Sequence, residues 1–140
     1  MKEESRFLTD SDYLTVIDSQ ALSVVKGEGT AVQLAEDRAV ELIAGYLRNR
    51  YDVEEIFACR GTDRNVAVVS WAVDIALYNM HSRLPGRMAG ELRKERYDLV
   101  IAELESISKG QVTPDLPLID YSDTGNPIKW GSQKQYNNRW

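Results

Sequence analysis

The sequence has a single cysteine, Cys59, and a single histidine, His81, in 140 residues. One cysteine excludes an internal disulfide and a thiolate-rich zinc site, and it is typical of a protein made in a reducing compartment. The chain also lacks an apolar run of 18 residues and a signal-peptide pattern at its start. We therefore expect a soluble cytoplasmic product that has no membrane partner.

A dense basic stripe is also missing, and the net charge is −5. Residues 1–110 carry 14 basic and 19 acidic side chains, whereas residues 111–140 carry three of each. Phosphate contacts from lysine and arginine supply most of the affinity for duplex DNA, so this balance argues against a protein that grips DNA firmly. An acidic balance does not exclude DNA nearby.

Motifs for catalysis are scarce. Asp74 and His81 lie seven residues apart and share a helix face, and an Asp–His pair can orient a general base. No serine or cysteine nucleophile is tied to that pair by a motif, so we interpret it as a structural polar cluster. Phosphate-binding loops and metal-ligand spacings are absent. We therefore predict no catalytic, cofactor-binding or metal-binding residues, and hence no enzyme.

Apolar residues recur at three- and four-residue steps from about Asn65 to His81, which predicts a helix. This helix is apolar nearly all round, as is typical of a helix with neighbours on several sides in a bundle. Thr62 or Asp63 is expected to cap its start. We take it as the centre of the fold.

Three further helices are expected. A short one follows Thr9, with Asp12 completing a capping box. Long ones span about 30–50 and about 85–108, the latter ended by Gly110. Gly45, inside the first of the long pair, is interpreted as a close helix crossing. Residues 18–29 are expected to form a loop with a helical fragment at 21–25, and residues 51–61 a connection.

The predicted fold is therefore all-α: a small helical bundle of three long helices plus a short N-terminal helix, with an extended C-terminal arm. The residues expected in its core include Tyr46, Val69, Val73, Leu77 and Leu104. Residues 1–110 are assigned to the helical domain and residues 111–140 to an extended tail.

The tail is unusual because prolines and glycines prevent a long helix while large aromatic residues persist. A disordered linker is normally poor in aromatics. We expect the tail to dock outside its own subunit through Tyr121, Trp130, Tyr136 and Trp140, since Trp and Tyr are frequent interface anchors. The alternative is a tail folded back on its own bundle.

The order of several local patterns resembles the small all-helical head–tail connector proteins of tailed phages, in their Mu-like branch. These patterns are FLTDSDYL at 7–14, Gly45-Tyr46-Leu47, Arg50-Tyr51, VDIALYNMH at 73–81, RYDLVIAELESISKGQ at 96–111 and Leu116-Pro117. The chain departs from the commoner pattern in the loop DVEEIF at 52–57 and in its long tail after Leu118.

The resemblance implies a structural virion protein at the head–tail neck. Such proteins form a homo-oligomeric ring beneath the portal protein, extend the DNA channel, and give the next neck or tail protein a surface to join. An alternative from a different class is a small helical binding or regulatory module that uses the aromatic tail to hold one protein partner.

Overall fold

The computed structural model describes residues 6–27, 30–83 and 90–120. Within these ranges the chain forms six α-helices and one 3₁₀ helix, and no strand. The elements are α1 (Asp10–Tyr13), α2 (Ser19–Lys26), α3 (Ala31–Leu47), α4 (Val53–Ala58), η2 (Gly61–Asp63), α5 (Val66–Ser82) and α6 (Gly90–Ser108). The all-α class predicted from the sequence is confirmed.

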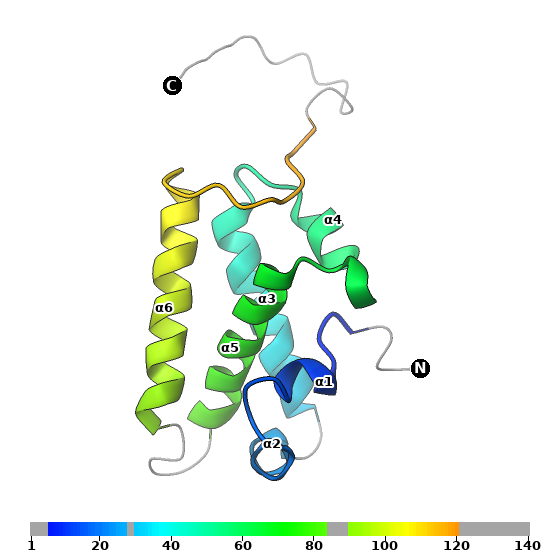
Figure 1. Ribbon diagram of the computed structural model, residues 1–140, viewed down its shortest axis with the longest axis vertical. Helices are drawn as coiled ribbons and strands as arrows, with labels where there is room; N and C mark the ends of the chain where they lie inside the picture. The colour runs from blue at the N-terminus through cyan, green and yellow to red at the C-terminus, as the bar shows by residue number, and fades with distance from the viewer. Residues whose placement is uncertain (1–5, 28–29, 84–89, 121–140) are drawn as a thin grey trace.

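The three long helices, α3, α5 and α6, pack against one another, and the short helices lie at the edges (Figure 1). α1 and α2 contact α5, while α4 packs on α3. α5 therefore has neighbours on several sides. This is why its sequence is apolar nearly all round, since only a helix enclosed by others can bury such a surface.

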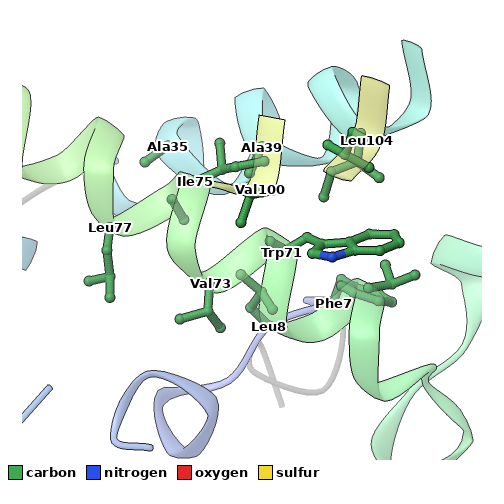
Figure 2. Packing of buried hydrophobic residues seen from close by; sticks show 14 of the residues in the cluster. Phe7, Leu8, Ala35, Ala39, Trp71, Val73, Ile75, Leu77, Val100 and Leu104 are labelled. Atoms are coloured by element: carbon green, nitrogen blue, oxygen red, sulfur yellow. The ribbon is translucent and has the colours of Figure 1, made fainter. Parts of the chain in front are cut away.

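The core is organised around α5. Figure 2 shows Ile75 pointing toward Ala35 and Ala39 of α3 and toward Val100 of α6. Val73 and Leu77 point away from these residues, on the other side of α5. Ala76 is also fully buried. Alanines at these positions allow the helix backbones to approach closely, while the larger side chains fill the remaining space.

The five residues predicted for the core differ in how deeply they are buried. Val73, Leu77 and Leu104 are buried, with 3%, 0% and 0% of their surface exposed. Tyr46 and Val69 are only partly buried and pack against the edge of the core. Val69 stays partly open because it lies beside a surface groove described below.

Two of the predicted helix ends are confirmed. The backbone N–H of Thr9 donates to the Asp12 carboxylate at 2.7 Å, completing the capping box. Gly110 has φ 82°, and its N–H donates to the Ile107 carbonyl at 3.0 Å. Gly110 thus occupies the left-handed position that ends a helix.

The predicted cap of the central helix is wrong. Thr62 and Asp63 belong to the 3₁₀ turn η2, and Asn65 caps α5 by accepting a hydrogen bond from the Val68 N–H at 3.1 Å. The connection at 51–61 contains a helix, α4, whose cap is Asp52. The expected start of the last helix at 85–87 lies outside the described residues.

The first part of the predicted tail is attached to the bundle. Leu116 is buried in the core with 8% exposed. The Asp52 N–H donates to the Pro117 carbonyl at 2.9 Å, and the Ile119 N–H donates to the Arg50 carbonyl at 3.1 Å. A chain ended at Gly110 would lose these contacts, so Asp120 is a better end point for a truncation than Gly110.

Gly45 does not lie at a close helix crossing, contrary to the sequence-based interpretation. It is exposed on α3, and a Cβ added there would meet no atom within 4 Å. Gly45 therefore only raises the conformational entropy lost when α3 folds.

We expect Gly45→Ala to stabilise the protein by about 0.4–1 kcal/mol, because alanine has the higher helix propensity and meets no obstacle. Urea unfolding of the two proteins measures the difference. Gly110→Ala is the matched control and should be destabilised, because its φ is 82° and the new Cβ would approach the Arg50 guanidinium to 3.3 Å. Equal stability of Gly45→Ala and the parent protein would contradict the prediction.

Candidate docking surface

An apolar groove of about 540 Å³ runs between α1 and the N-terminal half of α5. Its walls are formed mainly by valines: Val16 on the α1 side, and Val66, Val69 and Val73 on α5. Val66 is 84% exposed, so a large apolar side chain stands in solvent at the mouth of the groove. This volume is within the range of pockets that bind ligands and anchoring side chains.

One end of the groove is fixed by an ion pair. Arg64 donates to the Asp12 carboxylate at 2.6 and 3.1 Å, and to the Phe7 carbonyl at 2.7 Å. The Arg64 and Asp12 side chains are 13% and 12% exposed, so this pair is largely shielded from water. The groove is therefore preformed, which lowers the entropy cost of binding a partner there.

Burial of the Asp12 carboxyl favours its neutral form, but the hydrogen bonds from Arg64 and Thr9 outweigh burial and hold the pKa of Asp12 below its ordinary value of 3.8. A lowered folded-state pKa stabilises the fold above the unfolded pKa, and this contribution disappears as the pH falls through the folded-state value.

We expect Asp12→Asn to cost about 1–3 kcal/mol at neutral pH, because Arg64 loses its partner. The difference between the two proteins should shrink as the pH falls below the ordinary value of 3.8. Denaturant unfolding from pH 7 to pH 2 follows this difference. A gap that stays constant over the whole range would contradict the assignment.

A second network holds the N-terminal segment on α3. Glu36, which is 6% exposed, accepts from Arg6 at 3.1 and 2.6 Å and from the Tyr13 hydroxyl at 2.6 Å. Burial, and then the Glu36 charge, raise the pKa of Tyr13 above its ordinary range. The network therefore fixes the segment that carries α1, and with it one wall of the groove.

A smaller hollow lies on the other side of the same stretch of α5, against α6. Ser70 lines both hollows, and the α6 side is formed by Leu99, which is 68% exposed, and Glu103. Glu103 accepts from the Trp71 indole N–H at 3.3 Å. The outer face of α5 around Ser70 is thus exposed between the two hollows.

The Asp74 and His81 side chains do not form a pair. The Asp74 carboxylate accepts from Arg96 at 2.9 and 3.3 Å, while His81 Nδ1 lies 2.9 Å from the Leu77 carbonyl. Both are buried, with 5% and 8% exposed. Each thus has its own structural partner, so the single polar cluster of Asp74 and His81 expected from the sequence is wrong.

The sequence also predicted a docking site made of four aromatic residues in the tail. Tyr121, Trp130, Tyr136 and Trp140 lie outside the described residues, and their role stays a prediction. Reasoning from the sequence missed the groove and the Arg64–Asp12 pair. The valines at 66, 69 and 73 were visible in the sequence, but Val69 and Val73 were assigned to the core.

In the described part of the chain, no group of three or more His, Cys, Asp or Glu residues is arranged to hold a metal ion. Likewise, no helix within those ranges has the length and apolar character to cross a membrane.

These features define a small all-α protein whose described surface carries apolar hollows bordered by paired charges. The chain belongs to the phage protein family described as Bacteriophage Mu, Gp36, whose family model matches residues 2–126. This match confirms the Mu-like phage family expected from the sequence. No curated protein and no solved structure gives a significant match.

Proposed function

We propose that this protein is a structural virion protein of a tailed phage that forms a ring at the head–tail neck, between the portal and the tail. The observation that carries the proposal is the family match over residues 2–126. A phage protein of this family is a structural or morphogenetic component. The ordered patterns shared with head–tail connectors point to the neck as its position.

The charge of the chain supports a ring through which DNA passes. Residues 1–120 carry 14 basic and 21 acidic side chains, for a net charge of −7. A channel lined by surfaces of this sign repels the phosphate backbone, so DNA slides through it without being held. Its partners in this role are other copies of itself, the portal protein and the next neck or tail protein.

The proposed role needs no catalysis and no cofactor. His81→Gln should leave assembly of infectious particles near normal, because the His81 ring is bonded locally to the Leu77 carbonyl of its own helix. Particle yield measured beside the thermal stability of the purified variant separates the two effects. A fully folded variant that fails to assemble would give His81 a functional role.

Purified virions test the position of the protein directly. Gold-labelled antibody should mark the neck, and particles made without the gene should accumulate as filled heads and free tails. Antibody against the major capsid protein is the control and should mark the whole head. Absence of the protein from washed virions would contradict the proposal.

The alternative is a helical binding module that holds a single host or phage protein, and the preformed apolar groove is the observation that favours it. That function predicts normal neck structure in particles made without the gene. It also predicts a soluble complex with one partner, recovered from infected cells and absent from virions.

A further inference from the structure

The groove between α1 and α5 has the dimensions of a short extended peptide. Val66, Val69 and Val73 lie on one side of α5, and the first and last are seven positions apart, or roughly 10 Å at 1.5 Å per residue. Side chains two residues apart in an extended chain point to the same side and are separated by roughly 7 Å. Two neighbouring anchors of such a chain therefore fit along the row of valines.

The chain itself contains a segment with suitable anchors. In the sequence Pro127-Ile128-Lys129-Trp130, an extended conformation places Ile128 and Trp130 on one side and Lys129 on the other. Thr15 and Ser70 line the groove with hydroxyl groups that can accept a hydrogen bond from an indole N–H. A buried tryptophan generally needs such an acceptor.

Charge also favours this segment. Residues 121–140 carry three basic residues, Lys129, Lys134 and Arg139, and one acidic residue, for a net charge of +2. The rest of the chain has a net charge of −7. Electrostatic attraction therefore draws the segment to the body of the protein, and opposite net charges of this kind mainly raise the rate of association.

The direction of the chain distinguishes a second copy from the same copy. In Figure 1 the last described stretch of the chain, coloured orange, crosses the end of the molecule opposite α2. The Ile119 N–H bond to the Arg50 carbonyl fixes that exit. A chain that leaves in this direction must reverse to reach its own groove, whereas residues 121–128, which link Asp120 to the anchor Ile128, can span roughly 26 Å toward a neighbour.

We propose that the groove between α1 and α5 binds the Ile128–Trp130 stretch of a second copy. Each copy then offers one groove and one segment, which is the head-to-tail contact that closes a ring. The family match ends at residue 126, so the segment lies in a part of the chain that the family model does not cover. This inference rests on the proposed ring, because it identifies the contact between its subunits.

Photo-cross-linking in the full-length chain tests which segment occupies the groove. A benzophenone amino acid replaces Ser70, which is exposed and lines the groove. Copies labelled with ¹⁵N are mixed with unlabelled copies before irradiation. The expected product joins α5 of one isotope to residues 127–130 of the other. Cross-links confined to one isotope would assign the groove to the chain's own tail and overturn the proposal. An absence of cross-links to residues 127–130 would overturn it as well.

Two variants with complementary defects give a second test. Ser70→Lys places a long cation in the groove, and Trp130→Ala removes the main anchor of the segment. Each variant alone should lose the higher-mass species that the proposal predicts for the parent chain in light scattering. An equimolar mixture should form a dimer, because it restores one intact groove and one intact segment. A mixture that stays monomeric would overturn the proposal.

A matched control excludes a trivial cause. Ser23→Lys makes the same change on the exposed face of α2 and should keep the mass of the parent. A parent chain that is monomeric at its highest soluble concentration would overturn this contact. Gold labelling of the neck would remain positive in that case, so the two proposals fail separately.

Discussion

Replacing Leu77 by alanine is expected to destabilise the protein by about 2–5 kcal/mol. The Leu77 side chain is fully buried on α5, the helix on which the core is centred (Figure 2). Alanine removes three buried carbon atoms and leaves a cavity that the surrounding helices can close only in part. Close packing of neighbouring alanines in α5 limits such movement.

Urea unfolding followed by circular dichroism measures this loss. Leu99→Ala is the matched control, because Leu99 is 68% exposed on α6 and should change stability by less than about 0.5 kcal/mol. If both variants lost the same amount, the burial assigned to Leu77 would be wrong.

Sequence reasoning succeeded where the signal lies within a few residues. The three- and four-residue spacing of apolar residues predicted α5 because one helix face repeats at that period. Thr9 and Asp12 form a capping box that needs only their own backbone. Gly110 was identified because a left-handed position follows directly on a helix end.

Sequence reasoning failed where the local signal was too short or where several candidate caps lay close together. Asp52 was an available cap for α4, but a helix of six residues is too short to show a recognisable apolar period. Asn65 was passed over because Thr62 and Asp63, which are equally good caps, precede it by two or three residues. Only the bend made by η2 decides among the three.

The candidate docking surface could not be predicted from the sequence for a different reason. Its supporting contacts join residues distant in sequence: Arg64 to Asp12 across 52 positions, and Arg6 to Glu36 across 30. No spacing rule encodes such pairs, because they depend on how whole helices pack. The exposure of Val66 likewise depends on which side of α5 the other helices leave open.

The second large effect is expected at Asp74, between α5 and α6. Its carboxylate is 5% exposed and accepts two hydrogen bonds from Arg96, at 2.9 and 3.3 Å. Arg93 is also buried, with 7% exposed, and its Nη1 has no hydrogen-bond partner among the described residues. Burial lowers the pKa of Arg93, and the nearby charge of Asp74 opposes that shift.

Asp74→Ala should therefore cost about 3 kcal/mol, near the lower end for removing one member of a buried ion pair. Arg96 can turn toward water, since its side chain is 37% exposed, but Arg93 cannot. Denaturant unfolding gives the value. Asp98→Ala is the control, because its bond to Lys94 joins two exposed side chains and should contribute less than about 0.5 kcal/mol.

A double-mutant cycle separates the arginines. Arg93→Met keeps an unbranched apolar side chain but removes the buried charge, so it should recover part of the loss when combined with Asp74→Ala. Arg96→Met should recover less, because its charge can reach solvent once Asp74 is gone. Equal recovery by the two changes would contradict a special cost at Arg93. Greater recovery by Arg96→Met would show that the hydrogen-bonded arginine carries the penalty of the lost carboxylate.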